Sequence, residues 1–223
     1  MKYFRQILLI IGLSITIFGC LNQTTPNDKQ ESRSQFIKEK NLKYNENKGF
    51  FEDKFVEHFP SKIDENYISF IAERATDYDV IRFELTERID SNKIQSIKEK
   101  LSKQAIGNYK AQDSSLLVVN KGINKDNYYT WKKGYIETNS VKENINVYPI
   151  PNFWNNDFAE SSTASNLQEH FTIYVLDSKP GKFIDSKELT DGYGLPQKWK
   201  NGFSKGIAVS EYENVIIYWL IIW

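Results

Sequence analysis

The last nine residues of the chain, 215–223, carry no charged side chain and read Val-Ile-Ile-Tyr-Trp-Leu-Ile-Ile-Trp. A strand with one face in water alternates apolar and polar residues, and this run does not alternate. Nine residues are also too few to cross a bilayer as a helix. We therefore predict that 215–223 form a strand in the middle of a sheet, with both faces covered by the rest of the chain.

Several shorter segments have the patterns of further strands. In residues 80–86, Ile81, Phe83 and Leu85 alternate with polar residues, which is typical of a half-buried strand. Asp77–Asp79 and Glu211–Asn214 are expected to be hairpin turns. The other predicted strands are 67–72, 115–119, 128–136, 147–150, 171–176 and 206–210, and a long loop is predicted over 177–205.

Two short helices complete the predicted fold. Phe51, Phe55 and Phe59 recur every four residues before Pro60, which predicts a helix over 50–59. A second helix is predicted from Asp90 or Ser91, as the N-cap, to about 104, with its end near Gly107. The fold class is therefore α+β: a single domain at 46–223 with a mainly antiparallel sheet, two short helices and a buried C-terminal strand.

Composition excludes several function classes. The 223 residues include 29 Lys and Arg against 29 Asp and Glu, so net charge gives no electrostatic case for nucleic-acid binding. One cysteine forbids an internal disulfide and any cysteine-based zinc site. We find no H-E-x-x-H, P-loop or G-x-G-x-x-G motif, so we expect neither a metal nor a cofactor.

The N-terminus combines a basic start with a short apolar run. Lys2 and Arg5 precede residues 7–18, an apolar stretch of the length typical of secretory signals. The following Ile17-Phe18-Gly19-Cys20 resembles a bacterial lipobox, and this resemblance covers residues 1–20 only. It implies cleavage between Gly19 and Cys20 and acylation of the Cys20 thiol.

A lipid-anchored location in the bacterial cell envelope follows from that resemblance. Leu21, and not aspartate, follows the cysteine, which favours the outer membrane. The alternatives are a structural cysteine behind an ordinary signal and an uncleaved anchor helix. Residues 20–45 are predicted to be the lipidated cysteine and a flexible tether, with a transient helix at 36–43, because they are polar and contain few large apolar residues.

No catalytic motif has the context that its chemistry requires. Residues 202–206 match G-x-S-x-G, yet a loop is predicted before Ser204, and no Asp or His follows it in the chain. We therefore interpret Gly202 and Gly206 as turn residues. His58 and His170 are far apart and are expected to be structural or at the surface. The carboxylate pairs are expected in solvated segments: Glu52/Asp53, Asp77/Asp79 and Glu211/Glu213.

Two aromatic loops are the candidate ligand-binding sites. The first spans 152–158 and offers Phe153 and Trp154 beside the polar Asp157. The second spans 193–203 and includes Tyr193 and Trp199. Exposed rings supply a large contact area for a sugar or a protein partner at little entropic cost. The alternative is that the rings fold back onto the core.

These observations favour a non-enzymatic binding or interaction module anchored to the membrane through Cys20, with a protein or glycan partner. The competing hypothesis is an envelope hydrolase that cleaves polysaccharide or peptidoglycan with a carboxylate pair brought together by the fold. A third possibility is a structural component of a larger envelope complex, which predicts a flat apolar patch.

Overall fold

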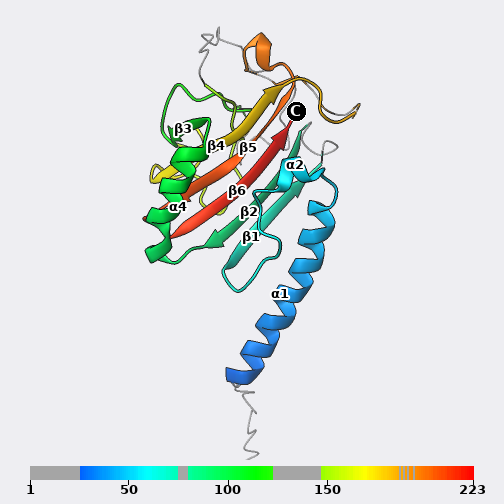
Figure 1. Ribbon diagram of the computed structural model, residues 1–223, viewed down its shortest axis with the longest axis vertical. Helices are drawn as coiled ribbons and strands as arrows, with labels where there is room; N and C mark the ends of the chain where they lie inside the picture. The colour runs from blue at the N-terminus through cyan, green and yellow to red at the C-terminus, as the bar shows by residue number, and fades with distance from the viewer. Residues whose placement is uncertain are drawn as a thin grey trace, which may run out of the picture.

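The computed structural model describes residues 26–74, 80–122, 147–185 and 194–223, together with 187, 189, 191 and 192. Its centre is a six-stranded sheet in the order β1-β2-β6-β5-β4-β3, with antiparallel pairing throughout (Figure 1). The strands are β1 (Tyr67–Glu73), β2 (Ile81–Arg88), β3 (Gly107–Lys110), β4 (Phe171–Pro180), β5 (Gly202–Ser210) and β6 (Val215–Ile222). The helices are α1 (Pro26–Lys48), α2 (Asp53–Val56) and α4 (Ser91–Gln104), with a 3₁₀ turn at Gln197–Trp199. The α+β single-domain prediction is confirmed.

The apolar C-terminal strand lies inside the sheet, as predicted. β6 pairs with β2 on one side and with β5 on the other. Trp219 and Ile221 point into a core on one face of the sheet, while Leu220 and Ile222 point into a core on the opposite face. Burial on both faces explains why the strand needs no polar alternate positions.

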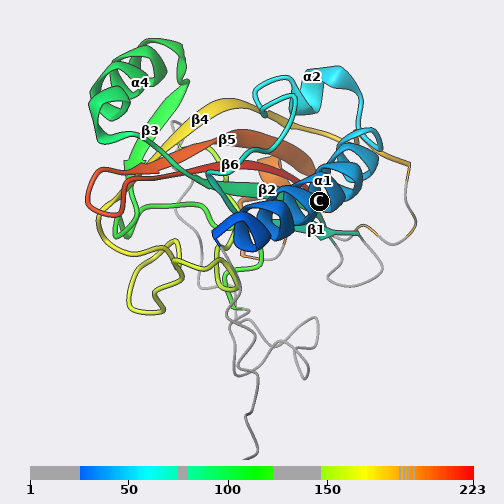
Figure 2. The same cartoon turned by 90° about the horizontal axis from the view of Figure 1, so that it is seen from below.

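Helices cover one face of the sheet and long loops cover the other (Figure 2). The prediction of α4 is confirmed: Asp90 is its N-cap and accepts a hydrogen bond from the Asn92 amide at 3.0 Å. Ile94 and Leu101 of this helix are buried against the sheet. The helix predicted over 50–59 is shorter in the structure, where only α2 is helical.

Two segments predicted as strands, 115–119 and 147–150, are not strands of the sheet but part of the loops that cover one face. Segments 115–119 and 147–150 meet only in an isolated bridge between Val118 and Ile150. The predicted strand at 128–136 lies outside the described residues. Gly107, expected to end the preceding helix, begins β3, which sequence analysis missed.

Helix α1 replaces most of the predicted flexible tether. The residues of α1 are largely polar, so the sequence pattern did not indicate that this segment packs against the domain. The helix is held by contacts with the segment that precedes β1: the Asn41 amide both donates to and accepts from the Ile63 backbone, at 2.7 and 2.8 Å. Tyr44 is fully buried and stacks on Phe83. The prediction of a flexible segment over 26–45 is therefore wrong, because a few specific contacts order the helix.

The predicted loop over 177–205 is also too long. Its first residues continue β4 as far as Pro180, and its last residues begin β5 at Gly202. Gly202 and Gly206 are therefore strand residues and not turn residues. A Cβ at Gly206 would lie 2.5 Å from the Trp219 ring, and one at Gly202 would lie 2.8 Å from the Trp223 ring. Glycine lets these indoles lie against the strand backbone.

Candidate functional site

The aromatic rings of the loop 152–158 are buried. Phe153 is 0% exposed and Trp154 is 8% exposed, and Phe153 packs edge-on against Trp219. Trp199 of the second loop is 3% exposed. The prediction of exposed stacking rings at these three residues is therefore wrong, and the alternative, packing onto the core, is confirmed. Tyr193 lies outside the described residues.

The amide groups of the loop 152–158 bind the polar side of β2 instead. Arg82 donates to the Asn152 carbonyl oxygen at 3.0 Å and to the side chain of Asn155. Asn156 donates to the Glu84 carboxylate at 3.2 Å. The loop is thereby fastened over the alternating polar residues of the strand, which the sequence pattern had indicated as only half-buried.

This Arg82 cluster contains two carboxylates but leaves no room for a substrate. The Arg82 guanidinium lies 2.7 Å from Glu84 and 3.7 Å from Glu73. Burial raises the pKa of Glu84, and the charge of Arg82 opposes that shift. The cavity that Glu73, Arg82, Asn152 and Trp154 line has a volume of about 20 Å³. That volume is about one water molecule, so the cluster holds the loop on the sheet.

The remaining catalytic candidates are Ser204, His58 and His170. The first two are held in the interior, and the third lies at the surface. Ser204 is fully buried within β5, so the G-x-S-x-G match is not a nucleophile elbow. The His58 ring lies 3.1 Å from the Trp219 carbonyl oxygen, and burial lowers the pKa of His58 to about 3. His58 is thus neutral at pH 7, in keeping with a structural role. His170 is exposed and stacks on Tyr212.

Two of the three carboxylate pairs named from sequence, Glu52/Asp53 and Glu211/Glu213, lie in the described part of the chain, and each has a glutamate that pairs with a lysine. Glu52 is exposed and pairs with Lys54 at 2.7 Å, and Glu211 pairs with Lys98. Asp77 and Asp79 lie outside the described residues. Among the described residues, no group of three or more His, Cys, Asp or Glu could hold a metal ion.

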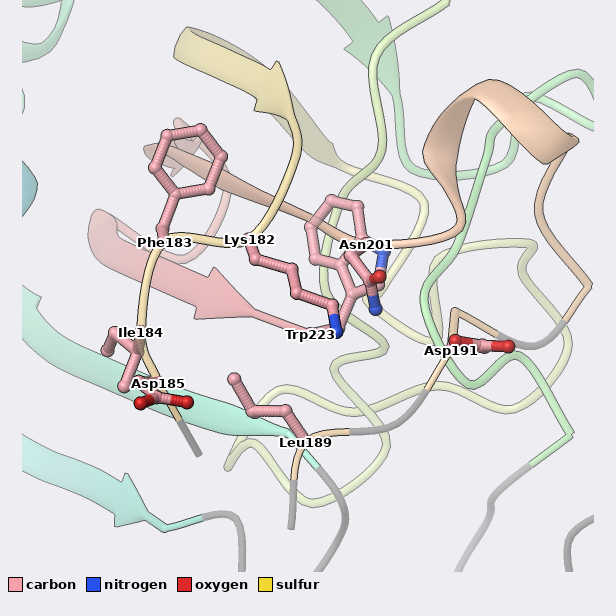
Figure 3. Close-up of a pocket in the computed structure, with 8 residues that line it drawn as sticks. All are labelled: Lys182, Phe183, Ile184, Asp185, Leu189, Asp191, Asn201 and Trp223. Carbon is pink, nitrogen blue, oxygen red and sulfur yellow. The ribbon is translucent and has the colours of Figure 1, made fainter. Parts of the chain in front are cut away.

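A pocket lies at the end of the sheet where β4, β5 and β6 meet the loop 181–201 (Figure 3). Its volume is about 370 Å³, at the lower end of the range for small-ligand sites. The side chains that line it are Lys182, Phe183, Ile184, Asp185, Leu189, Asp191, Asn201 and Trp223. We refer to this site as the β-end pocket.

Aromatic packing fixes the walls of the β-end pocket. The Trp223 indole donates its N–H to the Trp199 carbonyl oxygen at 2.8 Å, and the two indoles lie in contact. Phe183 packs edge-on against Phe203 with ring centroids 4.6 Å apart. The second aromatic loop therefore contributes to the site indirectly, because buried Trp199 positions the Trp223 wall.

Polar side chains surround these apolar walls. Figure 3 shows Asp185 and Asp191 on opposite sides of the pocket, with Asn201 and Trp223 between them. Both aspartates are exposed, and Asp191 lies 3.3 Å from Lys200. The pocket is thus equipped for hydrogen bonding to a ligand.

Sequence reasoning missed the lining residues of this pocket because they carry no motif. The described lining residues come from the irregular loop between β4 and β5 and from the last residue of the sequence. The only signal was the density of Gly, Pro and aromatic residues in 180–203, which marks a long loop where ligands often bind.

Comparisons with known proteins give no family. No protein-family model, curated protein or solved structure matches the chain. In the part of the chain that the structure describes, no helix is both long and apolar enough to cross a membrane. Residues 1–20, which resemble a signal sequence with a lipobox, lie outside the described residues.

Proposed function

We propose that this protein is a lipid-anchored component of the bacterial cell envelope whose domain is a non-enzymatic binding module, with the β-end pocket as its binding site. The observation that carries the proposal is the pocket itself: aromatic walls and hydrogen-bonding side chains lie together there, and its described lining residues include no serine, cysteine or histidine. Such a lining is typical of a ligand-binding site.

The lipid anchor rests on the lipobox residues and on the position of α1. Helix α1 begins six residues after Cys20 and extends away from the body of the domain (Figure 1). Its 23 residues span about 35 Å at the rise of an α-helix. This arrangement suits a domain that is held clear of a membrane surface.

Acylation is tested by metabolic labelling of the full-length protein with palmitate. Cys20→Ser should abolish labelling and release the protein from membranes. The control is Cys20→Ser/Ser34→Cys, which restores one thiol at an exposed position on α1 and should remain unlabelled. Label on the double variant, or unchanged membrane retention of Cys20→Ser, would refute the anchor.

Binding is tested by cross-linking the intact lipoprotein in its native cells and identifying what is recovered with it. We expect a protein or glycan in near-equal amount with the wild type and a clear loss with Asp185→Asn/Asp191→Asn. Glu169→Gln, an exposed residue outside the pocket lining, should not alter recovery. Equal recovery with all three forms would place binding elsewhere.

The hydrolase alternative has one observation in its favour, since Asp185 and Asp191 line the same pocket. Glycoside hydrolysis uses two carboxyl groups on either side of the scissile bond. If the protein is an enzyme of this kind, the wild type shortens polysaccharide or peptidoglycan fragments, and either Asp→Asn variant reduces the rate by orders of magnitude. Intact fragments after prolonged incubation with the wild type would leave the binding module as the function.

A further inference from the structure

We infer that the ligand of the β-end pocket is a neutral saccharide of one or two sugar units; this rests on the proposed binding function and names its ligand class. Half of the described lining side chains are apolar, and half are charged or carry an amide. A sugar ring combines the same two properties, because its C–H faces are apolar and its hydroxyl groups both donate and accept hydrogen bonds.

The polar groups of the pocket match hydroxyl groups in both directions. Asp185 and Asp191 accept hydrogen bonds, Lys182 donates them, and the Asn201 amide does both. Figure 3 shows these groups distributed around the apolar wall and not gathered on one side. The hydroxyl groups around a sugar ring would therefore find hydrogen-bonding side chains on more than one side of the ring.

Charge in and beside the pocket favours an uncharged ligand. Lys182 and Lys200 balance Asp185 and Asp191, and Asp191 is already paired with Lys200. No arginine is among the described lining residues, whereas phosphate and carboxylate ligands are commonly held by arginine forks. An anion would also meet two carboxylates, each of which would repel it.

The lining of the pocket argues against an acyl chain. An acyl chain would make no hydrogen bond to the four polar side chains of the lining. The volume of about 370 Å³ limits the ligand to a short saccharide or the end of a longer glycan.

The inference is tested by isothermal titration calorimetry on the full acylated chain in detergent, with maltose, cellobiose and chitobiose as probes. We expect at least one probe to bind with a millimolar or tighter Kd. Asp185→Asn and Asp191→Asn should each weaken that binding about tenfold, the value for loss of one hydrogen bond to a charged group. Both substitutions preserve shape, and the matched control Glu169→Gln should bind as the wild type does.

The outcomes separate this inference from the proposed function. Failure of all three probes at millimolar concentration overturns the saccharide class, and pocket-dependent recovery of a protein partner in the cross-linking experiment would then preserve the binding module. Binding that both Asp→Asn variants leave unchanged overturns the assignment to this pocket. Cleavage of a bound probe would keep the ligand class and refute the non-enzymatic function.

Discussion

Gly206 lies in β5, between its paired residues Val175 of β4 and Trp219 of β6. A Cβ added there would lie 2.1 Å from the Tyr174 carbonyl oxygen, far inside van der Waals contact. We expect Gly206→Ala to lower the free energy of unfolding by about 2–4 kcal/mol, measured by urea denaturation.

Gly49, which follows α1, provides the control for that substitution. Its added Cβ would lie 3.2 Å from the nearest atom, the Asn45 carbonyl oxygen, so Gly49→Ala should change stability by less than about 1 kcal/mol. Equal effects at the two glycines would show that close packing against Trp219 and β4 is not the cause.

His58 should make stability depend on pH. Burial lowers its pKa to about 3 in the folded protein, whereas the unfolded side chain titrates near the ordinary value of 6.5. Between these values the unfolded chain binds more protons, so the contribution of His58 to stability is complete above pH 6.5 and decreases as pH falls towards 3. The advantage of wild type over His58→Gln should shrink by roughly 2–3 kcal/mol from about pH 7 to about pH 4.

Other groups also titrate in this pH range. The quantity to measure is therefore the difference in unfolding free energy between the wild type and His58→Gln at each pH. Burial and the nearby Asp64 raise the pKa of Glu87 to about 7, so its contribution to stability decreases as pH rises from the ordinary value of 4.5 towards 7. This effect opposes that of His58 in the wild type and cancels in the comparison. Lys205, Glu57 and Lys48 also interact with the imidazole and are retained in both proteins. A constant difference across the pH range would contradict the buried neutral histidine.

At the scale of elements, α1 is held to the domain by contacts that run from Arg33 to Lys48, among them those of Asn41. Asn41→Ala removes both hydrogen bonds to the Ile63 backbone and should destabilise the docked helix by about 1–3 kcal/mol. Hydrogen exchange should then be faster for α1 amides, while exchange in β5 and β6 should be unchanged. Lys38→Ala, at an exposed position of the same helix, should leave α1 exchange unaltered.

The loop 152–158 depends on a buried ion pair with β2. Arg82→Met should lower the free energy of unfolding by about 3–5 kcal/mol, because Glu84 would remain buried without its cation. Arg82→Met/Glu84→Leu should recover part of that loss. A double-mutant cycle measures the coupling, and additive effects of the two substitutions would argue against a direct interaction.

Across the whole molecule, the accuracy of sequence prediction follows how local the determining interactions are. Helix α4 was predicted because its cap and apolar stripe lie within one segment. β6 was predicted because an uninterrupted apolar run has few stable solutions. In contrast, α1 is ordered by Asn41 and Tyr44, whose partners lie in the loop before β1 and in β2.

The candidate site was less accessible to sequence reasoning than the fold. Arg82 and Glu84 have the alternation of a half-buried face, and only the covering amides of the loop 152–158 show that the face is buried. The described lining of the β-end pocket comes from the loop 181–201 and from Trp223, and these residues form no recognisable motif. Trp199 was predicted to present an exposed ring to a ligand, whereas it is buried and its carbonyl oxygen accepts the Trp223 indole N–H.

The pairing of β2 with β6 has a consequence for how the chain reaches its native state. Pairs such as Arg88 with Val215 join residues about 130 positions apart, whereas β5 and β6 form a hairpin across a four-residue turn. Contacts between residues so far apart in sequence slow folding. We therefore expect the β5–β6 hairpin to form early and the β1–β2 pair to join it late, on a millisecond-to-second timescale. Until that step, β6 would present one unpaired, apolar edge, the kind of surface through which incompletely folded chains aggregate.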